Sequence, residues 1–300
     1  SQTTLSASDV AWLHALVADW QLIADLSFSD LVLWLPDAEA KGRWAAAQIR
    51  PTTGPTTLQE DVVGTFVPSD ETLAFERVLK TGESLDDVHE VIDATEDAED
   101  AEARVQLVPV RRERPIAVIE RRSATFGLRT SSRLETAYRH TAAELTEMIR
   151  VGELPVPGSR SELADSLRVG DGFVRTDSRG TVLFASPNAL SAYRRLGLAG
   201  DLVGADLVEV TTRLTAHGPG RPTDGSPAAL LAGEDQGETE IENPSASLLV
   251  RFIPVRSHGR RSGAVVLLRD VTELRLRERQ LVSKEATIRE IHHRVKNNLQ

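Results

Sequence analysis

Hydrophobic and polar residues follow a helical period and then a strand-like one over the first 50 positions. Val10–Leu26 carries apolar side chains close to helical spacing, and Ser8 or Asp9 is placed to cap the helix predicted there. Asp30–Pro36 is a short apolar run closed by proline, which predicts a buried strand. Gly42–Ile49 follows a polar turn and is predicted to be its hairpin partner.

The following segment predicts a helix and a second hairpin on either side of an acidic run. Ser69–Leu79 has a helical pattern, whereas Arg104–Val110 and Ile116–Glu120 have the pattern of two strands joined by a turn. Glu96–Glu102 has five carboxylates in seven residues. We interpret it as a solvated loop, because a calcium loop needs a glycine and a ligand spacing that are missing here. The order of these elements predicts an α+β domain with an antiparallel sheet over residues 1–130.

A connector is predicted over residues 131–158, most of it one amphipathic helix. Ser132 and Glu135 have the spacing of a capping box, and the helix is expected to end near Gly152. It could close the first domain or pack against its own copy in a dimer. Its small, alanine-rich face allows both, and we favour the dimer contact because the last helix of the chain also predicts a dimer.

Residues 159–272 predict a second α+β domain. Its expected strands lie at 171–177, 180–186, 239–243, 247–255 and 263–269, after a short helix at Ser161–Leu167. Asp177–Gly180 has the composition of a tight turn, with the glycine supplying positive φ. Ser186 and Pro187 have the residue types of an N-cap and a first helical position.

The end of the chain predicts a helix that pairs with another helix. Four apolar residues are each seven positions apart: Leu274, Leu281, Ile288 and Val295. If they are a positions, His292 is e and His293 is f, so His293 points away from the seam into water. A neutral imidazole there is a competent nucleophile that a phosphoryl donor can reach. From the residues alone, an ordinary solvated histidine beside basic neighbours remains the alternative.

Composition narrows the classes of function. The chain has no cysteine, which excludes disulfides, iron–sulfur clusters, thiolate zinc sites and cysteinyl–flavin photochemistry. A formal net charge of -10 argues against non-specific nucleic-acid binding. No apolar run approaches the roughly 20 residues that span a bilayer, and no secretory signal opens the sequence. We therefore expect a cytoplasmic protein that does not bind a membrane.

The segment His292–Gln300, His-His-Arg-Val-Lys-Asn-Asn-Leu-Gln, resembles the phosphoacceptor box of sensor histidine kinases, in the subgroup whose box is His-Arg-x-x-Asn. The resemblance implies that the histidine directly before the arginine takes the phosphoryl group. That residue is His293, with Arg294 beside it and Asn297 one helical turn later. His292 is the alternative acceptor.

Two further segments resemble sensor domains. Residues 19–30 are similar to the opening helix of a GAF-type sensor found in one actinobacterial kinase group, and residues 171–189 resemble the opening of PAS domains. Asp270, with Thr272, resembles the D-x-T element that ends PAS domains. We expect Asp270 to cap the next helix in a capping box with Glu273, which makes Asp270 and Thr272 candidates for signal relay.

The GAF resemblance also implies a possible small-molecule ligand between the sheet and the helical middle. Candidate pocket residues are Arg50, Thr52, Thr53 and Thr57, although Thr-Gly-Pro segments more often only form turns. For the PAS-like domain we favour a relay module without ligand over one with an unknown small ligand. Haem would need an axial ligand such as His217 or His258, and both are expected at the surface.

The whole chain resembles the cytoplasmic sensor histidine kinases of actinobacteria of the PdtaS type. The predicted boundaries are 1–130 for the GAF-like domain, 131–158 for the connector, 159–272 for the PAS-like domain and 273–300 for the coiled coil and phosphoacceptor helix. The resemblance implies a homodimer and an ATP-binding domain with Mg²⁺ beyond residue 300, with no cofactor in this chain itself. It also implies a response regulator with a receiver aspartate, which in that group is an RNA-binding antiterminator.

Two other outputs remain open. The chain could be a ligand-binding sensor or scaffold without kinase output, or the sensory part of a phosphatase- or diguanylate-type protein. The sequence does not indicate which stimulus is sensed.

Overall fold

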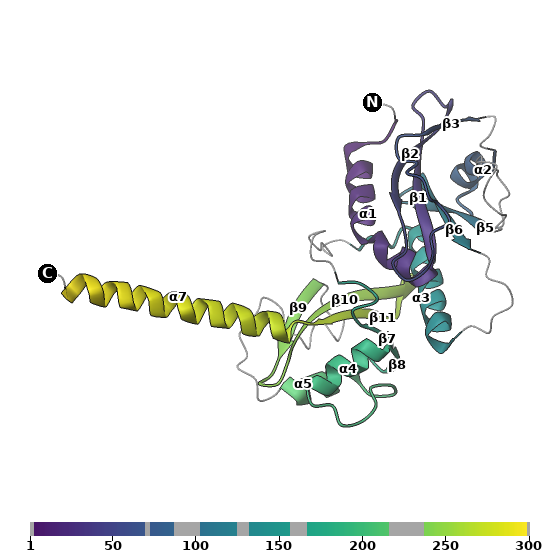
Figure 1. The fold of residues 1–300 in the computed structure, drawn as a ribbon. Coiled ribbons are helices and arrows are strands. Elements are labelled where there is room, and N and C mark those ends of the chain that lie inside the picture. Colours follow the sequence, from purple (N-terminus) through teal and green to yellow (C-terminus); the bar gives the residue numbers. More distant parts are fainter. Residues whose placement is uncertain are drawn as a thin grey trace.

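The computed structural model describes residues 3–69, 73–86, 103–124, 132–156, 167–215 and 237–298. They form two antiparallel sheets, the helices that cover them and one long C-terminal helix (Figure 1). The helices are α1 (Ala7–Ser27), α2 (Leu73–Thr81), α3 (Arg133–Val151), α4 (Pro187–Arg195), α5 (Leu207–Thr215) and α7 (Thr272–Asn298). The first sheet contains β1 (Ser29–Pro36), β2 (Gly42–Ile49), β3 (Phe66–Pro68), β4 (Leu85–Asp86), β5 (Ala103–Arg111) and β6 (Pro115–Ala124). The second contains β7 (Phe173–Asp177), β8 (Val182–Ala185), β9 (Gly237–Glu242), β10 (Ser247–Ser257) and β11 (Arg260–Asp270).

The first sheet has the strand order β3-β2-β1-β6-β5-β4 and is covered on both faces. Successive side chains of a strand point to opposite faces. Leu31 and Leu33 of β1 accordingly join the core under α1 and α3, whereas Val32 and Trp34 join a smaller core under α2. Both predicted hairpins, β1–β2 and β5–β6, are confirmed.

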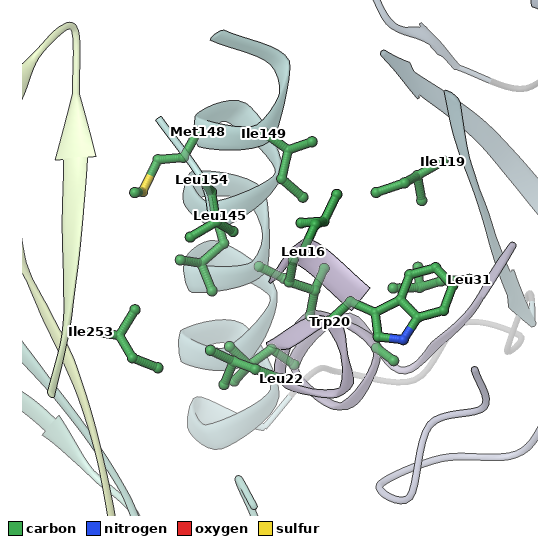
Figure 2. Packing of buried hydrophobic residues seen from close by; sticks show 14 of the residues in the cluster. Leu16, Trp20, Leu22, Leu31, Ile119, Leu145, Met148, Ile149, Leu154 and Ile253 are labelled. Atoms are coloured by element: carbon green, nitrogen blue, oxygen red, sulfur yellow. The ribbon is translucent and has the colours of Figure 1, made fainter. Parts of the chain in front are cut away.

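Helix α3 lies between the two sheets. Its apolar face, which includes Leu145, Met148 and Ile149, is buried against α1, β5 and β10 (Figure 2). Residues of the second sheet, among them Ile253 and Val265, belong to the same core. The expected dimer contact through this face is therefore wrong, because the face is already buried inside its own chain. The alternative, a helix that closes the first sheet, agrees with the structure.

Two buried arginines of the second sheet pair with acids on the helices of the first. Arg251 of β10 donates to Asp19 of α1 at 2.6 Å, and Arg175 of β7 donates to both carboxylate oxygens of Glu144 of α3 at 2.9 and 3.0 Å. The two arginine side chains are only 4 and 8 % exposed. Direction-dependent contacts thus fix the orientation of the second sheet on α1 and α3 in addition to the shared apolar core.

The second sheet has the order β8-β7-β11-β10-β9, and α4 and α5 cover its other face. The turn predicted at Asp177–Gly180 is confirmed, since the Asp177 carboxylate accepts from the backbone of Arg179 and Thr181 and Gly180 has φ +86°. Ser186 caps α4, as expected, and its hydroxyl also accepts from the backbone of Phe173 at 2.9 Å.

Several predicted boundaries differ from the structure. The cap of α1 is Ser6, because Ser6 and Asp9 form a reciprocal capping box that places Asp9 in the first turn. Ser132 caps α3 as predicted, but the Glu135 carboxylate pairs with Arg139 at 2.9 Å. Strand β3 was not predicted, because it pairs over only three residues. The expected helix at 161–167, the acidic run at 96–102 and position 217 lie wholly or almost wholly outside the described residues.

Candidate functional site

The long helix α7 starts directly where strand β11 ends, and its first residues are bound to the start of β10. The backbone N–H of Val271 donates to the carbonyl of Ser247 at 2.9 Å. The backbone N–H of Ser247 donates to the hydroxyl of Thr272 at 3.0 Å. Thr272 therefore holds the N-terminus of α7 against the start of β10, and its expected role in relay stays a prediction.

Asp270 connects three elements through its carboxylate. One oxygen accepts from the backbone N–H of Thr272 at 3.0 Å, and the other accepts from Arg195 at the end of α4 at 2.8 Å. Burial favours a higher pKa for Asp270, but these bonds to Thr272 and Arg195 outweigh it and hold the pKa below its ordinary value. The capping box expected with Glu273 is wrong for the described chain: the Glu273 side chain is exposed and makes no hydrogen bond to Asp270, which lies at the last paired position of β11.

Two arginines one turn apart bind α7 to the edge strand β9. Arg275 donates to both carboxylate oxygens of Glu240, and Arg279 donates to Glu242 at 2.7 Å. Residues i and i+4 share a helix face, and residues i and i+2 share a strand face. This contact was not predicted, although the spacings of four and two are visible in the sequence, because nothing in the sequence indicates that the two segments are adjacent.

Beyond this attachment α7 runs away from both sheets (Figure 1). Leu274, Leu281 and Ile288, the first three residues of the predicted heptad stripe, are 54, 61 and 54 % exposed. An apolar stripe of this length on a solvated helix is typical of a surface that another helix covers.

The predicted phosphoacceptor residues lie in the helical backbone of α7. His293 and Asn297 are four residues apart in this helix and so share one face. The side chains of His292, His293, Arg294 and Asn297 are outside what the structure describes, and their roles stay predictions.

The candidate pocket residues between β2 and β3 bind the chain itself. Thr52 donates through its backbone and its hydroxyl to Asp25 at 2.6 and 3.0 Å, and the Thr53 hydroxyl donates to the carbonyl of Asp25. Thr57 binds Asp30 in the same way, and the Arg50 guanidinium donates to three successive backbone carbonyls at positions 58–60. These side chains shape a loop, so the turn-forming alternative agrees with the structure.

The α2 face of the first sheet is filled by its own side chains. The Arg43 guanidinium lies over the ring of Trp34 at 4.7 Å from its centroid and near the ring of Phe75 at 5.4 Å. All three side chains are almost fully buried. The sequence analysis did not single out Arg43, whose burial depends on these distant partners.

The remaining expectations on metals and membranes concern the described residues alone. There, no group of three or more histidine, aspartate or glutamate side chains could hold a metal ion, and His258 is exposed in the β10–β11 turn. No helix in the described ranges is both long and apolar enough to cross a bilayer.

Comparisons with known proteins agree with this architecture. Residues 1–142 match the family model described as histidine kinase PdtaS, GAF domain. The chain is 40 % identical over 302 residues to the sensor histidine kinase PdtaS of Mycobacterium tuberculosis and 41 % identical over 308 residues to that of Mycolicibacterium smegmatis. Each alignment covers 99 % of this chain and 60 % of the relative, so the chain spans about three fifths of the length of these curated relatives.

A solved structure covers the same region. It is the sensor region of a sensor histidine kinase, with 37 % identity and a TM-score of 0.75 over 91 % of this chain and 96 % of its own. The GAF-like fold predicted for the first sheet is confirmed by these matches. The chain belongs to the family of sensor regions of sensor histidine kinases, and its residues 1–142 match the GAF domain of PdtaS.

Proposed function

We propose that this chain is the sensory part of a cytoplasmic two-component histidine kinase, with His293 as its phosphoacceptor. The observation that carries the proposal is helix α7, which is bound to the second sheet at one end and contains the His-Arg-x-x-Asn segment near its other end. Between them it exposes the stripe residues Leu274, Leu281 and Ile288. The similarity to PdtaS sensor histidine kinases supports it.

The exposed stripe supports a homodimer in which two α7 helices form a coiled coil. Leu274, Leu281 and Ile288 would then be covered by their copies, and His293 would lie on the outer face. ATP, held with Mg²⁺ in a domain outside this chain, would supply the phosphoryl group. On this hypothesis the imidazole nitrogen of His293 would bond to the γ-phosphorus while the bond from that phosphorus to the β,γ-bridging oxygen breaks and ADP leaves. The phosphoryl group would then pass from the imidazole to the receiver aspartate of a response regulator, an RNA-binding antiterminator by family resemblance, as its N–P bond breaks.

The second sheet is the proposed PAS-like relay module. Its strand order places β11, which leads into α7, in the centre between β7 and β10. A change in the first sheet would reach the second sheet through α1 and α3, which share a core with it. Asp270 and Thr272 would then pass the change on to α7. The domain boundaries at 130, 158 and 272 stay predictions of this proposal.

The experiment is autophosphorylation of the protein carried to its natural end. Acid-labile, alkali-stable label from γ-labelled ATP supports the proposal. ATP binding without any label, with candidate stimuli tested, would favour the scaffold alternative. Hydrolysis of a phosphoprotein or synthesis of a cyclic dinucleotide instead would favour the other sensory outputs.

Replacing Asp270 by alanine is expected to loosen the start of α7 without unfolding the second sheet. Amide hydrogen exchange at positions 271–275 should become at least about tenfold faster, since one hydrogen bond to an ionised group is worth roughly 1.5–3 kcal/mol. The autophosphorylation rate should change together with it. Asp201→Ala is the matched control, because Asp201 also accepts from the backbone two residues on, at Val203, and has no hydrogen bond to α7 among the described residues. Unchanged exchange and rate in Asp270→Ala would contradict the relay.

A further inference from the structure

A polar hollow of about 330 Å³ lies between α3 and the β4–β5–β6 edge of the first sheet. Asp86, Gln106 and Arg121 occupy directly paired positions on these three strands and form one row across the sheet. Thr146 and Arg150 line the opposite wall from one face of α3. The threonine loop and the α2 face, where the first ligand candidates lay, are not involved.

Arg121 supplies a cationic group to this hollow. Among the residues that the structure describes, no carboxylate forms an ion pair or hydrogen bond with its guanidinium. Burial lowers the pKa of Arg121, the charge of Asp86 partly offsets this, and the charges of Arg104 and Arg139 add to it. The Arg121 side chain is partly buried, and a cation that is partly withdrawn from water is less stable unless an anion accompanies it.

Arg150 on the opposite wall shows the contrast. It donates to both oxygens of Glu147 at 2.7 Å and to Glu83 at 3.1 Å, so its charge is compensated within the chain. The guanidinium that an incoming anion would meet is therefore that of Arg121.

Within the described part of the chain, two buried oxygen atoms of the wall residues also have no hydrogen-bond partner. They are Oε1 of Gln106 and Oγ1 of Thr146. The amide nitrogen of Gln106 is already used, since it donates to Asp86 at 2.6 Å, which leaves Oε1 as an acceptor only. A buried acceptor without a donor is unfavourable by about 1–3 kcal/mol, so the site favours a ligand with an N–H or O–H group.

We propose that this hollow binds a small organic acid with a hydroxyl or amino group beside its carboxylate. The carboxylate would pair with Arg121, and the donor would be accepted by Gln106 and Thr146. A volume near 330 Å³ corresponds to about ten non-hydrogen atoms, at roughly 30 Å³ for each water-sized group. Such a ligand would connect the sheet to α3, whose other face packs on the second sheet. The binding step does not depend on the proposed kinase function.

The test is calorimetric titration of this chain with L-lactate, L-malate and L-glutamate, and with acetate, which lacks the donor. At least one of the three acids should bind. Acetate should bind about tenfold more weakly, because it lacks one hydrogen bond, and a tenfold difference in affinity corresponds to about 1.4 kcal/mol. Arg121→Met should weaken binding of that acid at least tenfold. The matched control Arg77→Met, at an exposed position of α2, should change it less than about twofold.

Thermal unfolding of the ligand-free variants shows whether weaker binding comes from a lost ligand contact or from a less stable protein. Because Arg121 lacks a described anionic partner, Arg121→Met should leave the melting temperature unchanged or raise it. Three results would each overturn the proposal. The first is that none of the three acids binds when its concentration is raised in 10-fold steps up to about 10 mM. The others are binding that Arg121→Met leaves unchanged, and a clear fall in the melting temperature of the Arg121→Met variant.

Discussion

Replacing His293 by glutamine in the protein carried to its natural end should abolish acid-labile phosphorylation from ATP, by at least about 100-fold. His292→Gln should retain it. The reason is the predicted heptad register: with Leu274, Leu281 and Ile288 as a positions, His293 would be an f position on the outer face of the coil. His292 would be an e position, beside the seam. The amide of glutamine is not a nucleophile that could accept the phosphoryl group in place of the imidazole. The incorporated label and its acid lability are the measurement.

The two histidines are each other's control. Glutamine keeps a polar side chain of similar size and good helix propensity, so both variants should have the circular dichroism and the oligomeric state of the unmodified protein. Loss of label in His292→Gln alone would retain the kinase but show that the helix register is shifted. Label retained in both variants would exclude this segment as the phosphoacceptor site.

Elements encoded by local pattern were predicted well. The hairpin β1–β2 follows from a proline-closed apolar run and a polar turn, and the β7–β8 turn follows from Asp177 and Gly180. Ser186 and Pro187 define the start of α4 by local hydrogen bonding and backbone geometry alone. Such features depend on neighbours in sequence, so the sequence contains the necessary information.

Features that depend on distant partners were missed or misassigned. The apolar face of α3 was visible, but its periodicity could not indicate whether α1 and β10 of the same chain or a second copy would cover it. Arg251 and Asp19 are 232 positions apart, and Arg275 meets Glu240 across 35. The threonines of the loop at 52–57 had the composition of both a turn and a polar pocket. Only their bonds to Asp25 and Asp30 distinguish the two.

The largest stability effect is expected at the ion pair that joins α3 to β7. Glu144→Ala leaves the Arg175 guanidinium, which is 8 % exposed, with backbone carbonyls as its described acceptors and without its anion. Removing one partner of a buried pair costs about 3–5 kcal/mol, and the partial exposure of Glu144 places the expected loss near the lower value. The free energy of unfolding from urea titration at neutral pH measures it.

Two further variants separate the charge from the packing. Glu135→Ala is the matched control on the same helix, because its exposed pair with Arg139 should contribute less than about 0.5 kcal/mol. The double variant Glu144→Leu with Arg175→Met replaces the pair by apolar side chains and should recover most of the lost stability. The double variant can also be placed in the protein carried to its natural end. If it is stable there but the autophosphorylation rate no longer responds to a stimulus at the first sheet, the Glu144–Arg175 pair transmits the change from α3 to the second sheet. A single variant as stable as the unmodified protein would instead show that Arg175 is compensated by its backbone acceptors, and the orientation of the two sheets would then rest on their shared apolar core.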